Sequence, residues 1–427
     1  MDRVGGKTLS VRSGPGRTTI NDLGALWIND SNQSEVYKLF ERFHLESELQ
    51  RTTGKSIHQA QDGTTTAAPY DSPLSEEVRM ALTQLLPAWS QLIEEHNLED
   101  PRASPQAKRL DSMSFAHYCE KELNLPAVLD VANQITRGLL GVEAHEISML
   151  FITDYITSAT GLANIVSERK DGGQYMRCKT GMQSLCHGMS KELAPGSVHV
   201  NTPVAEIEQS ASGCIVRSSS GAVLRSKKVV VSVPTTLYPT LTFSPPLLAE
   251  KRALAENSIL GYYSKMVFVW DKPWWREQGF SGVFQSSLNP ISLARDTSIE
   301  ADQQWSITCF MVGEPGRRWS QLSKQVRQKS VWEQLRTAYE NAGAKVPEPV
   351  NALEIEWSKQ QYFLGAPSPV YGLNDLTTLG GEIRTPFKSV HFVGTETSLV
   401  WKGYMEGAIR SGQRGAQEVV ASLAPPA

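Results

Sequence analysis

The stretch that most constrains the fold is SVHFVGTETSLVWKGYMEGAIRSGQRGAQEV, residues 389–419. Its apolar start predicts a short strand, the Gly-Thr pair after it predicts a tight turn, and the remainder predicts a long helix. Small residues recur in two rows along this helix, at Gly403, Gly407, Ser411 and Gly415 and at Ala408, Gly412 and Ala416. Because glycine costs about 1 kcal/mol per site in a helix interior, the flat face indicates close approach of another surface. That surface is either a neighbouring helix or sheet, or a flat cofactor at the helix N-terminus.

The composition is typical of a globular protein with more than one domain. A chain of 427 residues exceeds one ordinary hydrophobic core, and its 40% hydrophobic and 20% charged content fits a soluble protein. The net charge of -3 and the scattered basic residues give no reason to expect a nucleic-acid partner. The five cysteines are dispersed, without a CxxC pair or Cys/His metal spacing, so they predict no metal site and suit a reducing compartment.

Neither end of the sequence reads as a targeting signal. The stretch MDRVGGKTLSVRSGPGR is polar and lacks the apolar core of a secretory signal. There is no run of about 18 apolar residues that would predict a membrane span, and the final SLAPPA is neither a membrane tail nor a peroxisomal address. We therefore expect a cytoplasmic protein without a membrane span.

The pattern of apolar residues predicts a mixed α/β chain. Helical spacing predicts helices at residues 33–45, 182–193 and 321–342 and a helical insertion from 74 to 166, whereas the polar residues 54–73 predict a loop. Strands are predicted within residues 198–234, 262–270, 305–313 and 354–362, and a strand through DLGALW is expected to end near Trp27. The run KKVVVSVP, residues 227–234, is apolar almost throughout, which is typical of a strand buried on both faces.

The GTET turn and the following WKGYMEGAIRSG resemble the C-terminal flavin-binding signature of the flavin-containing amine oxidases, the monoamine and polyamine oxidase family. The match is dense across residues 389–419. The resemblance implies an α/β fold in which two domains interleave. The first is an incomplete Rossmann-like FAD-binding domain, residues 1–73, 174–250 and 381–427. The second is a substrate domain with a mixed sheet and helices, residues 74–173 and 251–380.

Residues near the N-terminus resemble the family's loop after the second strand of the nucleotide domain. This loop contains Arg3, Gly5, Gly6 and Lys7, and its glycines allow positive φ and close backbone approach. The family usually has Arg where Lys7 stands. Lysine keeps the positive charge for the cofactor phosphates but cannot make the bidentate hydrogen bonds of a guanidinium. The resemblance also implies that the isoalloxazine ring lies beside Gly24, Ala25, Leu26 and Trp27 and that the adenine edge meets the backbone of Val204. Without the resemblance, Gly-Gly-Lys is an ordinary turn and Val204 a plain strand valine.

Three residues are expected to be catalytic. Lys265 lies among aromatic and apolar neighbours on a predicted strand and matches the family lysine that holds a water near flavin N5. A fixed cation there would stabilise negative charge that develops during the reaction; the alternative is a surface lysine at a strand end. Trp357, with Tyr362 nearby, matches a tryptophan along the pyrimidine side of the flavin. Tyr404 matches one aromatic wall of the substrate cage, while the opposite wall is Pro367.

The C-terminal signature supplies the remaining cofactor contacts. The positive end of its helix is expected to face the flavin N1 and C2 carbonyl. Glu396 resembles the acidic residue near the ribityl chain, although capping its own helix is an alternative role. Ala366 stands where covalent family members carry Cys, so FAD would be held noncovalently. The predicted contacts from this signature are Gly394, Thr395, Glu396, Gly403, Tyr404 and Met405.

One expected family element is missing from the sequence. The family begins with a strand, a GxGxxG turn and a helix that carry the pyrophosphate, followed by an acidic residue for the ribose. The only related stretch, SGPGRT at residues 13–18, has Pro15 inside the turn and no helix after it. Three accounts remain open: a truncated version of an ordinary amine oxidase, a natural short form that binds flavin weakly, or a degenerate relative.

These observations lead to two functional hypotheses. In the first, the protein uses FAD and O2 to oxidise a small amine to an imine or aldehyde and releases hydrogen peroxide. In the second, it is a flavin-free or weakly flavin-binding relative that acts as a binding or scaffold protein. The sequence leaves the identity of the amine open.

Overall fold

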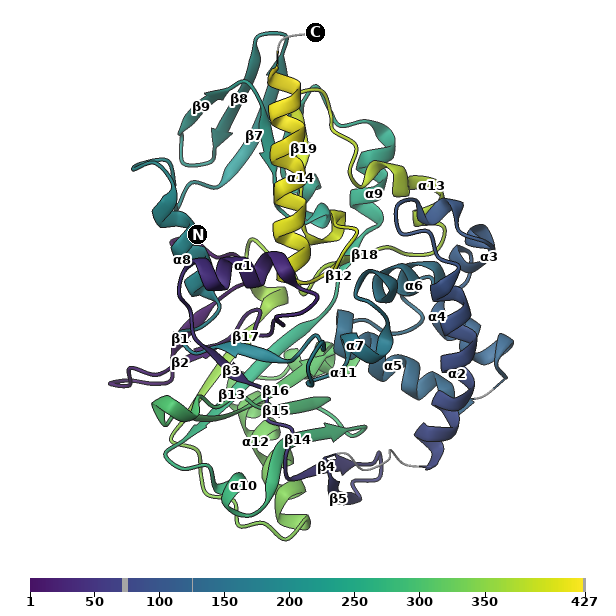
Figure 1. Ribbon diagram of the computed structural model, residues 1–427, viewed down its shortest axis with the longest axis vertical. Helices are drawn as coiled ribbons and strands as arrows, with labels where there is room; N and C mark the ends of the chain where they lie inside the picture. Colours follow the sequence, from purple (N-terminus) through teal and green to yellow (C-terminus); the bar gives the residue numbers. More distant parts are fainter. Residues whose placement is uncertain (71–75, 125, 425–427) are drawn as a thin grey trace.

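The computed structural model describes residues 1–70, 76–124 and 126–424. Three parts are visible in Figure 1: a mixed sheet in the lower half, a helical region on the right, and an upper part around the long C-terminal helix. Segments from both ends of the chain meet between these parts. The N-terminal helix α1 (Ser34–Arg42) crosses the start of the C-terminal helix α14 (Met405–Leu423).

The largest sheet has seven strands, in the order β17-β13-β16-β15-β14-β4-β5. β13 (Tyr263–Trp270) is the strand on which the expected catalytic lysine lies, and it pairs antiparallel with both β16 (Trp305–Val312) and β17 (Asn351–Glu356). Helix α12 (Lys324–Asn341) packs on this sheet through Val331, Leu335 and Tyr339. The remaining strands are β14 (Phe280–Ser286), β15 (Leu293–Asp296), β4 (Lys55–Gln59) and β5 (Thr65–Pro69).

The prediction of a loop over residues 54–73 is wrong for the part that the structure describes. β4 pairs parallel with β14, and β5 pairs antiparallel with β4 at the edge of the sheet. This edge strand is mostly exposed, so its Thr and Ala residues show none of the apolar alternation that marks a half-buried strand. Pairing with a strand more than 200 residues away, rather than local pattern, forms this hairpin.

The helical insertion is present as predicted, apart from residues 74, 75 and 125, which lie outside the described residues. Its core includes Trp89, Phe115 and Tyr155, together with Trp401 from the segment that leads into α14. The C-terminal segment is therefore anchored in the helical region. The helices are α2 (Glu76–Glu94), α3 (Ala107–Asp111), α4 (Phe115–His117), α5 (Pro126–Leu140), α6 (Met149–Ser158) and α7 (Leu162–Ile165).

The upper part contains a four-stranded sheet, in the order β11-β7-β8-β9, and a separate parallel pair, β10 (Val229–Val231) with β19 (Val390–Phe392). The expectation that the 227–234 run is buried on both faces is wrong, because Val230 is 44% exposed. Among the described residues β10 pairs only with β19, so one edge of the strand has no neighbour. The four strands are β7 (Val204–Ser210), β8 (Gly213–Ser218), β9 (Val223–Ser226) and β11 (Thr242–Ser244).

The small-residue face of α14 packs on the chain's own strand and turn. A Cβ added at Gly415 would lie 2.4 Å from Val393 Cγ1, and one added at Gly407 would lie 2.4 Å from the Trp401 carbonyl oxygen. The Ser411 hydroxyl accepts a hydrogen bond from the Gly394 amide at 3.1 Å. The first of the two alternatives, a neighbouring element, thus accounts for these positions.

Other boundaries agree with the sequence to within a few residues, with two exceptions. The strand through DLGALW ends earlier than expected, since β2 covers only Ile20–Asp22. The strand expected up to residue 362 ends at Glu356, and a 3-10 turn (Trp357–Lys359) follows. The shorter elements are β1 (Ser10–Arg12), β3 (Ser47–Leu49), β6 (Met176–Cys178), α8 (Gln183–Glu192), α9 (Ala249–Asn257), β12 (Ile259–Leu260), α10 (Trp274–Glu277), α11 (Gly313–Ser320), β18 (Pro369–Val370) and α13 (Asp375–Leu379).

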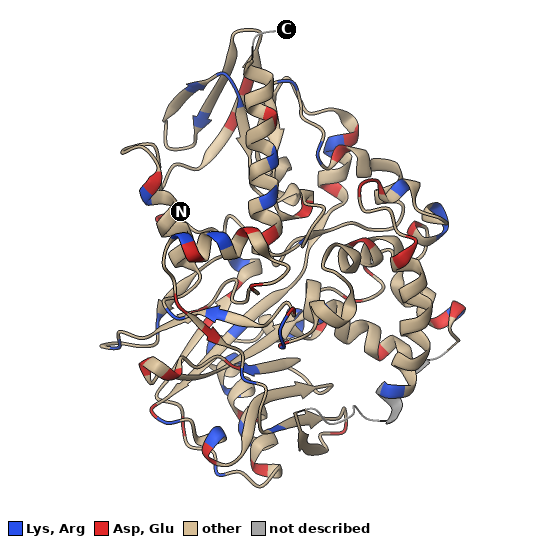
Figure 2. Ribbon diagram, in the orientation of Figure 1, with Lys and Arg blue, Asp and Glu red and all other residues tan. Residues whose placement is uncertain are grey.

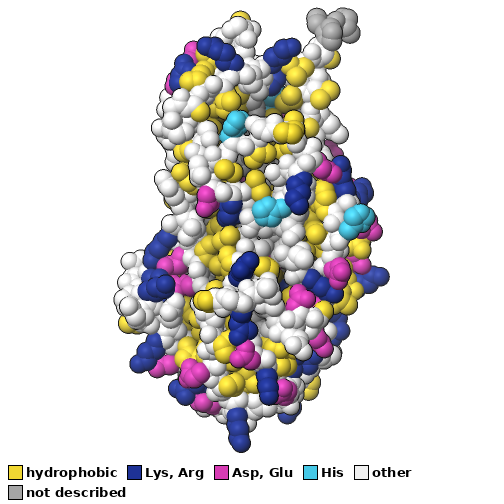
Figure 3. Space-filling model, turned by 90° about the vertical axis from the view of Figure 1, so that its left-hand side faces the viewer, with side chains coloured by type: hydrophobic (Ala, Val, Ile, Leu, Met, Phe, Trp, Pro, Cys, Tyr) yellow, Lys and Arg dark blue, Asp and Glu magenta, His cyan; other side chains and the backbone are white. Residues whose placement is uncertain are grey.

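Charges are mixed over the molecule. Figure 2 shows acidic and basic residues interspersed along all three parts, and on the face turned toward the viewer in Figure 3 they are scattered among apolar and neutral side chains. None of the described helices combines the length and the apolar composition that a bilayer crossing requires. Within the described residues, no three His, Cys, Asp or Glu side chains are grouped as a metal site.

Candidate active site

Lys265 lies in the middle of the molecule, where β13 faces the N-terminal segment. Its side chain is 4% exposed, and its Nζ donates to the Gly24 carbonyl oxygen and lies 5.3 Å from the centre of the Phe310 ring. Burial lowers the pKa of Lys265 to about 8, and the nearby Asp22 carboxylate opposes that shift. The predicted strand lysine is therefore a buried cation rather than a surface residue.

Asp22 is the counter-charge that the sequence reasoning missed. It ends β2, accepts hydrogen bonds from the Ser10 hydroxyl and from the Met182 amide at 3.1 Å, and is buried. Burial raises its pKa to about 6, and Lys265 is among the groups that oppose this rise. Asp22 is the first residue of the segment DLGALW, but nothing in the sequence indicated that it would lie near Lys265, 243 positions later.

The segment 24–27 lies in close backbone contact with residues 7–9 and is joined to β13 through the Lys265 side chain. A Cβ at Gly24 would lie 2.0 Å from the Lys7 carbonyl oxygen, so only glycine fits there. The Trp357 indole donates to the Leu23 carbonyl oxygen at 3.0 Å. Trp27 stacks on Phe310 at 5.9 Å between ring centres. Trp357, the segment 24–27 and Lys265, which were singled out separately in the sequence, are thus brought together.

Three tyrosines from three parts of the chain surround the start of α14. Burial and the neighbouring Tyr263 raise the pKa of Tyr404, and burial and Tyr404 do the same to Tyr155. Tyr263 also packs edge-on against Phe310, with ring centres 5.9 Å apart. A Cβ at Gly403, which has a φ of +82°, would lie 2.4 Å from the Tyr155 hydroxyl. Tyr155, Tyr263 and Phe310 were not predicted, since their proximity arises from contacts between segments far apart in the chain.

The N-terminus of α14 has a backbone amide without a hydrogen-bond acceptor among the described residues. Its N-cap residue, Tyr404, makes no side-chain cap, and the Met405 amide has no acceptor among the described residues. The buried Glu406 carboxylate in its first turn faces elsewhere: it accepts from the amides of Glu35 at 2.9 Å and Val36 at 2.8 Å, at the start of α1. The positive end of this helix is therefore available to a carbonyl or anionic group.

Lys7 and Glu396 form a second buried polar group. Lys7 Nζ donates to the Pro367 carbonyl oxygen at 2.9 Å, and burial lowers its pKa to about 8, against the opposing charge of Glu396. Glu396 accepts from the Thr235 amide at 2.9 Å and from its hydroxyl at 3.1 Å, and burial raises its pKa. A Cβ at Gly394 would lie 2.5 Å from the Glu396 carboxylate, while the Thr395 hydroxyl donates to the Tyr404 carbonyl oxygen at 2.8 Å.

The other predicted residues have local or peripheral positions. The Arg3 guanidinium donates to the carbonyl oxygens of Thr8 at 2.9 Å and Gly6 at 2.8 Å, so it braces its own loop. Gly5 and Gly6 have φ values of +114° and +56°. Val204 begins β7 in the other sheet and is 39% exposed. Ala25 and Leu26 complete the segment beside β13, and Ala366 is buried.

The chain is similar to known proteins along almost its whole length. The family described as flavin containing amine oxidoreductase matches residues 1–420. A probable flavin-containing monoamine oxidase A of Dictyostelium discoideum is 27% identical, over 98% of this chain and 90% of its own length. The putrescine oxidase of Kocuria rosea is also 27% identical, over 98% of this chain and 88% of its own.

Solved structures show the same fold. A wild-type putrescine oxidase bound to putrescine superposes with a TM-score of 0.90 at 25% identity, covering 98% of this chain and 92% of that one. The cyclohexylamine oxidase of Brevibacterium oxydans gives 0.90 at 26% identity, covering 99% and 92%. The predicted mixed α/β fold of the flavin amine oxidases is confirmed. From the matched profile and these structures together, the chain belongs to the flavin-containing amine oxidoreductase family.

Proposed function

We propose that this protein is an FAD-dependent oxidase that converts a small amine to an imine, which water hydrolyses to an aldehyde, with O2 reduced to hydrogen peroxide. The single observation that carries the proposal is the buried Lys265 ammonium, which faces Asp22 beside aromatic side chains and the segment 24–27. Amine oxidation itself follows from the family. The named relatives act on monoamines, putrescine or cyclohexylamine, so a small amine is the substrate class we assign.

The residues present fit the ring and ribityl end of FAD. An isoalloxazine ring carries carbonyl and ring-nitrogen acceptors, and the chain offers donors at two places: the Lys265 ammonium and the unpaired Met405 amide at the positive end of α14. The buried Glu396 carboxylate would accept from a ribityl hydroxyl. The Lys7 ammonium would supply a positive charge for the phosphates. Because Ala366 has no thiol, no thioether forms at that position and the cofactor is held noncovalently.

The protein's part in the reaction is to orient, to exclude water and to hold charge. When bound, FAD supplies the two-electron chemistry by accepting a hydride equivalent from the amine's α-carbon. The rings of Tyr404, Tyr263 and Phe310 make a dry wall against which the alkyl part of the amine packs. Lys265 places a fixed cation where negative charge develops, which stabilises the transition state more than the ground state. No general base is required if the amine arrives neutral.

The experiment that tests this proposal uses the purified full-length chain incubated with FAD. We expect visible flavin absorbance after gel filtration, complete release of the flavin on acid precipitation, and peroxide release with some member of a panel containing putrescine, cyclohexylamine and aromatic amines. A protein that stays colourless and inactive in the presence of added FAD would overturn the proposal. Flavin that remains with the acid precipitate would overturn noncovalent attachment alone.

The second hypothesis, a flavin-free binding or scaffold protein, finds no support in the comparisons. The curated relatives and the solved neighbours named above are described as oxidases.

A further inference from the structure

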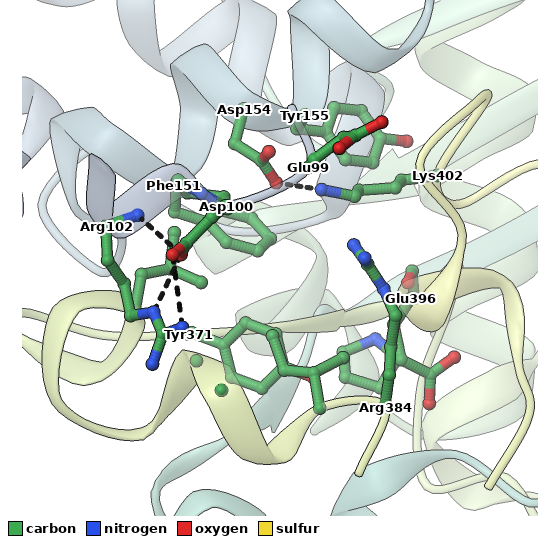
Figure 4. Close-up of a pocket in the computed structure, with 17 residues that line it drawn as sticks. Glu99, Asp100, Arg102, Phe151, Asp154, Tyr155, Tyr371, Arg384, Glu396 and Lys402 are labelled. Carbon is green, nitrogen blue, oxygen red and sulfur yellow. Dashed lines mark hydrogen bonds and ion pairs between the residues drawn. The ribbon is translucent and has the colours of Figure 1, made fainter. Parts of the chain in front are cut away.

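A polar cavity lies between the helical region and the C-terminal segment. Its volume is about 170 Å³, and Lys265 is not among its lining residues. Figure 4 shows α6 contributing Asp154 and Tyr155 from one side, while Tyr371, Arg384, Glu396 and Lys402 come from the C-terminal segment. Arg384, Lys402 and this cavity have no part in the amine oxidation proposed for the protein.

Three of the four carboxylates around the cavity already have partners, whereas Glu99 makes no side-chain hydrogen bond within the described residues and lies near Arg384. Asp100 accepts from Arg102 Nε at 2.7 Å and Nη2 at 3.1 Å. Asp154 pairs with the Lys402 ammonium and with His96 Nε2 at 3.0 Å. Although burial alone would raise the pKa of Asp154, Lys402 and His96 hold it below its usual value, so the pair is charged. Glu396 is satisfied by Thr235, as described above.

The donor side chains around the cavity, in contrast, have N–H or O–H groups without an acceptor among the described residues. Arg384 donates through Nε to the Thr397 carbonyl oxygen at 2.9 Å, and its two terminal nitrogens have no acceptor among the described residues. The Tyr371 hydroxyl is buried, in a residue only 2% exposed, and has no hydrogen-bond partner there either. Lys402, 7% exposed, uses one ammonium proton on Asp154. Figure 4 shows the ends of Arg384 and Lys402 directed toward the same space.

We propose that this cavity is an oxyanion site that takes a phosphate group. A guanidinium fork and an ammonium directed toward one space, with Tyr371 in the wall of the cavity, match a group with several acceptor oxygens. A buried donor left without an acceptor is costly, and an oxyanion supplies the acceptors that the protein lacks here. The phosphate has two sources, the diphosphate of the dinucleotide or a free anion. The first source rests on the proposed function, because the cavity borders Glu396.

Titration calorimetry of the flavin-free, full-length protein with inorganic pyrophosphate tests the site directly. We expect saturable binding that Arg384→Gln weakens at least tenfold, a change equivalent to about 1.4 kcal/mol. The matched control is Arg318→Gln on α11, whose side chain is 64% exposed, and it should bind as the wild type does. Absence of binding to folded wild-type protein, or equal binding by Arg384→Gln, would overturn the proposal.

A second variant guards against misfolding of the first. Tyr371→Phe removes only the unpartnered hydroxyl, keeps the ring packed, and should weaken pyrophosphate binding about threefold, as expected for one neutral hydrogen bond. Unchanged binding in this variant would exclude Tyr371 from the site and count against the proposal. Circular dichroism and the unfolding midpoint confirm that each variant is folded.

Competition distinguishes the two sources of phosphate. If pyrophosphate weakens FAD binding but not riboflavin binding, and Arg384→Gln does the same, the site holds the diphosphate of the dinucleotide. If pyrophosphate binds without changing FAD affinity, the site holds a free anion; either result supports an oxyanion site. Failure of FAD to bind at all would overturn the proposed function, while the pyrophosphate titration would still decide this inference.

Discussion

Lys265 and Asp22 are a charged pair that the protein buries at a cost. Burial drives the pKa of Lys265 down to about 8 and that of Asp22 up to about 6, and each charge partly offsets the shift of the other. Between these values the ammonium and the carboxylate are both charged. A pair poised in this way contributes little to stability compared with apolar packing. It does fix a cation at one point of an otherwise dry site, which suits a role in charge stabilisation.

Replacing Lys265 by Met should impair turnover even where the variant remains folded. The methionine fills the same space without the charge, and Asp22 then becomes neutral at a higher pH. We expect kcat with the best amine to fall about a hundredfold, the typical effect of removing one preorganised charge or donor. Because Asp22 stays buried without its counter-charge, the unfolding midpoint should fall as well, so kcat is measured below the midpoint of the variant. Lys272→Met, on an exposed residue next to the same strand, is the control and should keep full activity. A Lys265→Met enzyme with wild-type kcat would remove this residue from the reaction.

The pH dependence of turnover should report the coupling between the two residues. Lys265 has a folded-state pKa lowered to about 8 from 10.5, so its charge is lost as pH rises through about 8. Activity that needs the ammonium should fall on the alkaline side of that value. Asp22→Asn removes the carboxylate that raises the lysine pKa, so the alkaline limb of kcat/KM should move to lower pH. The same amine is used for both proteins, so ionisation of the substrate affects both profiles equally.

The control for this shift is Asp271→Asn, on a carboxylate whose side chain is 66% exposed and pairs with Arg17. Its profile should overlay that of the wild type. An alkaline limb that stays in place in Asp22→Asn would show that the limb belongs to another group.

At the level of elements, long periodic segments were predictable and short paired ones were not. The patterns of α12, α14 and β13 extend over enough residues to identify the kind of element from local sequence alone. β4 and β5 escaped notice because their partner, β14, lies far along the chain and β5 is largely exposed. The exposure of Val230 in β10 was missed for the related reason that an apolar run does not reveal how many neighbours a strand has.

Alanine substitutions at neighbouring glycines of α14 should change the free energy of unfolding in opposite directions. Gly415 and Gly407 each face atoms 2.4 Å from where a Cβ would lie, whereas a Cβ at Gly412 would meet nothing within 4 Å. Gly412→Ala should stabilise the protein by about 0.5–1 kcal/mol, because it only improves helix propensity. Gly415→Ala should destabilise it by about 1–3 kcal/mol through overpacking against Val393.

Urea unfolding of the wild type and the two variants measures these free energies, with Gly412→Ala serving as the matched control for helix propensity. Equal effects at the two sites would show that the helix does not sit on β19 as described. Gly407→Ala should behave like Gly415→Ala, since the Trp401 carbonyl oxygen cannot move aside without disturbing the turn into the helix.

At the scale of the whole molecule, the candidate site contains residues that the sequence identified and residues that only the structure reveals. The resemblance identified Lys265, Trp357 and Tyr404, and the structure brings the first two against the segment 24–27. Asp22, Tyr155 and Tyr263 went unrecognised because each is an ordinary residue in its own element. They become site residues only when the N-terminal segment, the helical region and the large sheet meet, a relation that no spacing along the chain encodes.

Because the site is built where several parts of the chain meet, cofactor binding should stabilise the complete protein. The proposed cofactor contacts come from the N-terminal loop, from the large sheet at Lys265 and from the start of α14, so FAD would bind only the assembled native chain. At a free FAD concentration about 100 times its Kd, binding adds about 2.7 kcal/mol to the free energy of unfolding. For a chain of 427 residues, this corresponds to a rise of about 3 °C in the unfolding midpoint.

Scanning calorimetry with and without FAD measures this rise, and riboflavin, which lacks the adenylate and diphosphate, is the comparison ligand. If the scan resolves two transitions, both should move to higher temperature, because the contacts that define the site belong to the large sheet and to the C-terminal helix alike. A shift confined to one transition would mean that FAD contacts only one of these parts, which contradicts a site built between them. No shift at saturating FAD would contradict binding to the native chain altogether.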